Sequence, residues 1–288
     1  MLYVQDKKSP YVYERLKDTV AYRFEIEEYT QFYDHSIKNK YRQDLEVDFA
    51  SEYSKSAFIF EVITTNQQYT LDPSLKKQEA LIRDLSSITE KVELGIDTSG
   101  DIESLLNHDE IKEKWGAILL RLKRQHQGAL AHGYLDAIGE KIKDKKRFTT
   151  DLKQYRMLGM LFNTLLRIPF DDKTIKKRPR TFTNMIHSLP VHITEHLTLV
   201  NEDAATNLLT YAVTGMLQSI DGETTSRIKK YLKYYEAGED SVYLESYTGQ
   251  YTIDKYTAWT TNAHIAITIS NGRGYRRHQQ FSLKKQDV

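Results

Sequence analysis

The chain has 288 residues, a formal net charge of +1 and no cysteine. Disulfides, thiolate nucleophiles, iron–sulfur clusters and cysteine-ligated zinc are therefore excluded. The near-neutral charge argues against nucleic acid or an anionic membrane as a partner. No run of about 18 apolar residues is present, so the sequence predicts no membrane span.

The first residues are charged and lack the apolar core of a signal peptide. We therefore expect a cytoplasmic protein. A periplasmic or secreted protein is the alternative if a signal peptide was trimmed from it. The unusual number in the composition is 20 tyrosines. Tyrosine favours strands and half-buried positions, which predicts a large sheet with one face partly exposed. The alternative is an aromatic binding surface, because tyrosine gives contact area at low entropy cost.

In the N-terminal part, apolar and polar side chains alternate over 20–27 and 45–49, which predicts half-solvated strands. A more apolar run at 58–63 predicts a buried strand. Asp72 and Pro73 begin a short helix, because proline is tolerated at the first helical position.

The segment 89–124 reads as strand, turn, strand and capped helix. Its first strand covers 92–96 and its turn ends at Gly100, which can adopt a positive φ. Asn107 is placed to cap a helix whose first turn is acidic, as the helix dipole favours. Trp115 belongs to the apolar stripe of that helix.

Further helices are predicted over 128–142 and 148–168, the second ended by Pro169. A basic loop follows, and then strands at 191–197 and 208–217 and a helix over 225–237 that is closed by Gly238. The last four strands are predicted at 242–247, 250–254, 262–270 and 275–283. Asn271 and Gly272 predict a hairpin turn between the last two strands.

These elements predict an α+β fold with antiparallel sheets at both ends of the chain and a helical middle. A short likeness between 94–100 and 251–258 raises the hypothesis of two related halves. We expect an N-terminal sheet with the helical segment at 1–172, a basic connecting loop at 173–180 and a C-terminal α+β segment at 181–288. One integrated domain is the alternative.

Histidines provide the candidate catalytic residues, which are His187, His192, Glu195 and His196. On a helix, His192 and His196 would share a face, as metal ligands do. However, the segment is rich in β-branched residues and the HExxH order is absent, so a solvated strand face is the preferred interpretation. A metal-assisted hydrolase is the alternative. No nucleophile elbow or phosphate-binding loop is present, and no cofactor or bound metal is expected.

Basic and aromatic residues provide the candidate binding positions. These are Tyr247, Tyr251, Arg273, Tyr275, Arg276 and Arg277. Basic residues beside aromatic ones can hold a nucleic-acid backbone, which makes a nucleic-acid-binding module the second alternative. Solvated loops on a neutral protein are the simpler interpretation.

The pattern of Ile96, Asp97, Gly100, Asn107 and Trp115 resembles one in uncharacterised proteins of Bacteroidota bacteria. The resemblance implies no enzyme activity. Together with the tyrosine content and the absence of catalytic motifs, it favours a non-catalytic interaction protein of the accessory or immunity type. Such a protein would bind a protein partner through a tyrosine-bearing sheet surface. The sequence leaves the partner and the oligomeric state open.

Overall fold

A computed structural model describes residues 19–54, 57–97, 100–154, 156–163, 165, 176–186, 189–238 and 240–287. Its strands form one antiparallel sheet of 11 strands, in the order β5-β4-β3-β2-β1-β11-β10-β9-β8-β7-β6. The strands are β1 (Val20–Phe32), β2 (His35–Ser54), β3 (Ala57–Thr70), β4 (Lys91–Asp97), β5 (Ile102–Leu105), β6 (Lys176–Ile186), β7 (Leu189–Asp203), β8 (Leu208–Leu217), β9 (Tyr243–Asp254), β10 (Thr260–Ser270) and β11 (Tyr275–Lys285).

The helices lie in three places along the chain. A 3-10 helix and α1 connect β3 to β4, α2 to α5 lie between β5 and β6, and α6 lies between β8 and β9. Their bounds are η2 (Pro73–Gln78), α1 (Glu79–Ser87), α2 (His108–Gln125), α3 (Ala129–Lys143), α4 (Lys145–Gln154), α5 (Arg156–Leu161) and α6 (Gly222–Tyr234). No helix in these described segments has the length and apolar character needed to cross a membrane.

The expectation of an α+β fold with separate antiparallel sheets at the two ends of the chain and a helical middle is wrong. Strand β1 pairs with β11 in antiparallel register from Tyr22 opposite Lys285 to Phe32 opposite Tyr275. This pairing joins two consecutive meanders, β1–β5 and β6–β11, into a single sheet. Residues from both predicted segments, 1–172 and 181–288, therefore lie in neighbouring strands.

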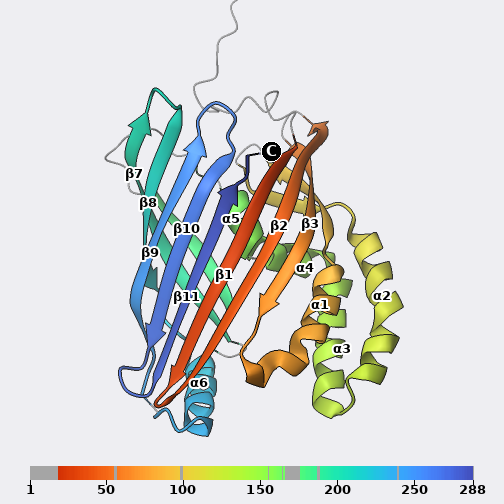
Figure 1. Ribbon diagram of the computed structural model, residues 1–288, viewed down its shortest axis with the longest axis vertical. Coiled ribbons are helices and arrows are strands. Elements are labelled where there is room, and N and C mark those ends of the chain that lie inside the picture. The colour runs from red at the N-terminus through yellow and green to blue at the C-terminus, as the bar shows by residue number, and fades with distance from the viewer. Residues whose placement is uncertain are drawn as a thin grey trace, which may run out of the picture.

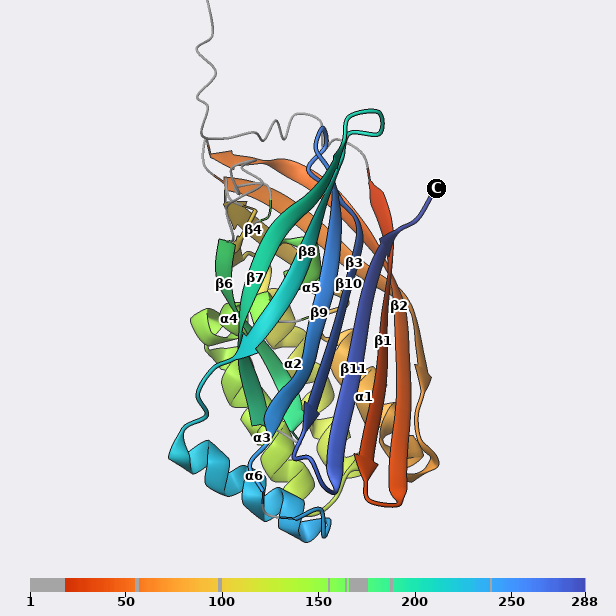
Figure 2. The ribbon, with the colours of Figure 1, turned by 90° about the vertical axis from the view of Figure 1, so that its left-hand side faces the viewer.

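The sheet curves around its helices. Helix α5 packs on β10 and β11 near the middle of the sheet, while α4 contacts both β5 and β6, which are its two edge strands. Figures 1 and 2 show α1 to α5 gathered on the same face and α6 crossing one end of the sheet. Because α4 contacts both β5 and β6, the two edge strands of the sheet lie near the same helix.

The burial of alternate side chains explains why these segments form strands. In β1, Tyr22 and Phe24 are buried while their neighbours are half-buried. Such alternation places one face against the core. The predicted strand 208–217 coincides with β8. The two strands predicted at 242–247 and 250–254 are one continuous strand, β9.

The turn between β10 and β11 confirms the hairpin prediction. Gly272 has a φ of 75°, a conformation that suits glycine. The Asn271 side chain accepts hydrogen bonds from the backbone N–H groups of Arg273, Gly274 and Tyr275. Its amide also donates to the carbonyl of Ala237, 2.6 Å away, just after α6. One side chain therefore shapes the turn and fastens α6 to the end of the sheet.

Helix α2 begins where the sequence predicts, with Asn107 at the N-cap position. The side chain makes no capping bond, however. It accepts from the Glu93 N–H at 2.9 Å and donates to the Lys91 carbonyl at 3.1 Å. Asn107 therefore ties the start of the helix to β4. Trp115 is buried, which confirms the apolar stripe. Within the helix predicted over 148–168, the described residues form α4 and α5, and both Tyr155 between them and Pro169 lie outside the described residues.

Candidate functional site

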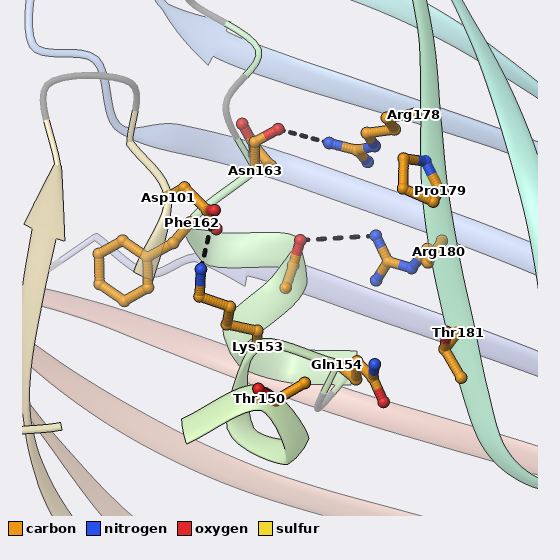
Figure 3. Close-up of a pocket in the computed structure, with 11 residues that line it drawn as sticks. Asp101, Thr150, Lys153, Gln154, Phe162, Asn163, Arg178, Pro179, Arg180 and Thr181 are labelled. Carbon is orange, nitrogen blue, oxygen red and sulfur yellow. Dashed lines mark hydrogen bonds and ion pairs between the residues drawn. The ribbon is translucent and has the colours of Figure 1, made fainter. Parts of the chain in front are cut away.

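A pocket of about 370 Å³ lies between the two edges of the curved sheet. This volume falls within the range of about 300–1,000 Å³ that is typical of small-ligand sites. The pocket is bordered by the residue before β5, by α4 and the region of α5, and by the edge strand β6 (Figure 3). Its lining residues are Asp101, Thr150, Lys153, Gln154, Gly159, Phe162, Asn163, Arg178, Pro179, Arg180 and Thr181.

Strand β6 positions two arginines on the pocket wall. Residues 176–180, expected in a connecting loop, form the first half of this strand. Because side chains two residues apart on a strand share a face, Arg178 and Arg180 point the same way. Their side chains are only 14% and 10% exposed. Pro179 between them is compatible with an edge strand, where a missing N–H costs no ladder bond.

The two arginines meet a buried carboxylate. Glu195 on β7 lies directly opposite Arg178 in the strand register and is fully buried. Arg178 Nε donates to one Glu195 oxygen, and Arg180 Nε lies 3.7 Å from the other. The Tyr247 hydroxyl donates to that second oxygen. Glu195 is therefore held by an arginine from β6 and a tyrosine from β9.

Further hydrogen bonds fix the guanidinium groups to β9 and to the region of α5. Arg178 Nη2 and Arg180 Nη1 donate to the Tyr251 hydroxyl over 3.1 and 3.0 Å. Arg178 also donates to the carbonyl of Asn163, and Arg180 to that of Gly159 at 3.5 Å. Figure 3 shows both guanidinium groups directed from β6 towards the end of this helix.

A glycine makes the contact between Tyr247 and Glu195 possible. Gly215 on β8 lies opposite Glu195 in the register. A Cβ atom at Gly215 would lie 2.6 Å from the Tyr247 ring. The ring therefore crosses β8 in space that only glycine leaves open, and its hydroxyl reaches β7.

Electrostatics keep this cluster charged. Burial acts to raise the pKa of the Glu195 carboxyl, but the charges of Arg178 and Arg180 and the Tyr247 hydrogen bond hold that pKa below its ordinary value. Burial and the Glu195 charge raise the pKa of Tyr247 well above its usual range, so the phenol remains a donor. Two guanidinium groups thus share one carboxylate, and the three groups together carry a formal charge of +1.

A third cation faces the same pocket from α4. Lys153 Nζ donates to Asp101 Oδ2 over 3.0 Å, and the two side chains are 35% and 45% exposed. The pocket therefore lies beside one buried ionic cluster, on β6 and β7, and is also lined by one partly exposed ion pair, Lys153 with Asp101.

The structure places Glu195 apart from the two histidines of the predicted cluster that it describes. His192 and His196 share the more exposed face of β7, while Glu195 lies on the opposite, buried face. His192 Nδ1 is 3.0 Å from the Thr181 hydroxyl. His187 lies outside the described residues. Among the residues that the structure describes, no group of three or more histidine, aspartate and glutamate side chains could hold a metal.

The predicted basic and aromatic positions fall into two groups. Tyr247 and Tyr251 are buried and join the arginine cluster, whereas Tyr275 is buried beneath α6. The three arginines lie elsewhere, each in an ion pair: Arg273 with Asp240, Arg276 with Glu245 and Arg277 with Glu28.

The sequence reasoning placed Arg178 and Arg180 in a basic loop at 173–180 and did not choose them as site residues. The signal that could have found them is the period-two spacing of Arg178, Arg180 and Phe182, which are all directed to one face of β6. No protein-family model matches the chain, and no curated protein matches it either. The resemblance to Bacteroidota proteins therefore stays a prediction.

Proposed function

We propose that this protein binds a small anionic ligand in the pocket between the sheet edges. The observation that carries the proposal is the pairing of two largely buried arginines with a single buried carboxylate at the pocket wall. Buried charges are stable when they are paired, and an anion in the pocket would balance the remaining positive charge.

Geometry supports the same ligand class. Guanidinium groups present planar N–H donors that match the oxygens of carboxylates and phosphates. Arg178 and Arg180 lie on one strand face, and Lys153 adds an ammonium group from α4. Phe162 contributes an apolar surface to the lining, which would suit a small organic anion.

The test is a calorimetric titration of the protein with inorganic phosphate, sulfate and acetate at constant ionic strength. We expect saturable binding by the wild type. Arg180→Gln should weaken it by about 10- to 100-fold, because a hydrogen bond to a charged group contributes about 1.5–3 kcal/mol. Lys153→Gln, at a more exposed position, should also weaken binding and carries less risk for folding.

Arg273→Gln is the matched control, because it removes an arginine charge from an exposed ion pair outside the pocket. It should bind like the wild type. The proposal fails if none of the three anions binds saturably, or if Arg180→Gln and Lys153→Gln both bind as tightly as the wild type.

Protein binding is the second candidate function, and a cluster of exposed tyrosines favours it. Tyr33, Tyr234, Tyr235 and Tyr243 are exposed at the end of the sheet near α6. The rings of Tyr234 and Tyr235 are 5.0 Å apart. Tyr33 and Tyr243 both approach the glycine-rich turn between β10 and β11. Tyrosine is enriched in protein interfaces because it offers a large, rigid contact surface.

Co-purification from the native host tests this second candidate. A partner that binds the tyrosine end should be retained by the wild type and lost by the double variant Tyr33→Ser with Tyr234→Ser. Tyr256→Ser removes an equally exposed tyrosine from another turn and should retain the partner. Equal retention by the double variant would exclude this surface as the interface.

A further inference from the structure

The two ion pairs of the pocket differ in how easily an incoming anion could displace them. Glu195 is fully buried and receives hydrogen bonds from Arg178 and Tyr247. Separating such a pair leaves an uncompensated buried charge, which is strongly unfavourable. The pair of Lys153 and Asp101 is partly open to solvent, where ion pairs contribute little. A ligand would therefore displace Asp101 and leave Glu195 in place.

The backbone at Asp101 favours a displacement that involves the side chain alone. The Asp101 N–H donates to Asp97 Oδ1 over 3.0 Å, and the Asp97 N–H donates to the Asp101 carbonyl over 2.9 Å. These bonds hold the main chain of Asp101 to that of Asp97. The carboxylate of Asp101 can leave Lys153 by rotation into solvent without disturbing them.

Charge then selects the ligand. Among the described residues, the three cations of the lining together with the carboxylates of Asp101 and Glu195 have a net charge of +1 while Asp101 is paired to Lys153. With the Asp101 carboxylate turned into solvent, Lys153 and the arginine cluster present a net charge of +2 to the ligand. A monocarboxylate would balance only the first state, whereas a phosphate dianion balances the second.

We infer that Asp101 is an internal competitor for the anion site and that the ligand is a phosphate-type dianion, either free phosphate or a phosphate monoester. The inference rests on the proposed anion-binding function. In the structure the Asp101 carboxylate accepts a hydrogen bond from Lys153. On binding, phosphate oxygens replace it there while other oxygens of the same group face the arginines of β6.

The decisive experiment measures phosphate affinity of the full chain and its Asp101→Asn variant by calorimetry, at about pH 8, where phosphate is mainly a dianion. The substitution keeps the shape of the side chain and removes its charge. We expect phosphate to bind about fivefold more tightly, which corresponds to about 1 kcal/mol for an exposed ion pair that no longer competes. Wild-type protein should bind phosphate and sulfate more tightly than acetate.

Asp240→Asn is the matched control. Asp240 pairs with Arg273 at 3.1 Å and is 44% exposed, much like Asp101, but it lies outside the pocket. This variant should bind phosphate as the wild type does. Phenyl phosphate distinguishes the two sources of the dianion. Tighter binding than inorganic phosphate identifies a monoester that also contacts Phe162, and equal or weaker binding identifies free phosphate.

The inference is overturned if Asp101→Asn binds phosphate no more tightly than the wild type, or if acetate binds the wild type as tightly as phosphate. Either result leaves the proposed anion site standing. If neither the wild type nor Asp101→Asn binds any of the anions, the proposed function fails and the inference fails with it.

Discussion

At the scale of single residues, Glu195 lies behind the pocket wall and pairs with the two arginines that line it. Its carboxylate is fully buried, and a buried carboxylate is costly unless it is paired and hydrogen-bonded. Arg178 and Tyr247 provide those bonds, and the nearby Arg180 adds a second positive charge. The same pairing makes the two arginines tolerable on a largely buried wall. Without the Glu195 carboxylate, the two charged arginines would lack the partner that stabilises them on the pocket wall.

Glu195→Gln should reduce the free energy of unfolding at neutral pH by about 3–5 kcal/mol, because it leaves two guanidinium groups without their countercharge. The pKa of Glu195 is lowered in the folded state, so its stabilisation is complete above the unfolded pKa of about 4.3. It is lost as the pH falls through the lower folded pKa. Urea unfolding of both proteins from neutral to acidic pH measures the effect.

The difference between the two proteins should therefore shrink as the solution is made more acidic than the ordinary range of glutamate. A difference that is constant over the whole pH range would contradict the assignment of a charged Glu195. Unchanged stability at neutral pH would show that the ion cluster contributes nothing to folding.

At the scale of elements, a glycine on β8 allows a side chain of β9 to contact a side chain of β7. Gly215 lies between Glu195 on β7 and the Tyr247 ring, whose strand β9 is on the other side of β8. The tyrosine can reach the carboxylate because nothing stands between them. Glycine is required at this position because a side chain would fill the space of the Tyr247 ring, and not because of its backbone conformation.

Gly215→Ala should destabilise the protein by about 1–3 kcal/mol, because the new methyl group would overlap the Tyr247 ring and the side chain of Ile193. Gly116→Ala is the control with the opposite sign. Gly116 lies in α2, and apart from its chain neighbours and the backbone of its own helix no described atom lies within 4 Å of the added methyl group, so alanine should stabilise the helix by up to about 1 kcal/mol. Chemical denaturation of both variants checks the two signs, and an unaffected Gly215→Ala protein would refute the packing argument.

Elements with a strong local pattern could be predicted from the sequence. The strand predicted over 208–217 is β8, and the Asn271–Gly272 pair predicts the turn before β11. Asn107 shows where local reasoning stops. Its position before α2 is correct, but its hydrogen bonds go to β4, which only the packed structure brings near. Lys176–Arg180 was misassigned because its basic composition outweighed its period of two.

At the scale of the whole molecule, the decisive contact leaves no local trace in the sequence. The pairing of β1 with β11 converts two predicted sheets into one. Nothing in either strand alone specifies its neighbour. The same is true of the pocket, whose lining comes from the β5 edge, from α4 and α5, and from the β6 edge. Individual site residues could be suspected from the sequence, but their meeting could not.

The pairing of β1 with β11 also has a consequence for the order in which the protein is made. The pairing partner of Phe32 in β11 is Tyr275, which is synthesised about 240 residues later. At cellular rates of about 5–20 residues per second, one side of β1 stays without its neighbour for about 10–50 s on the ribosome. During that time its backbone offers an open strand edge to other chains. The protein thus passes through an aggregation-sensitive period during synthesis, which ends when β11 pairs with β1.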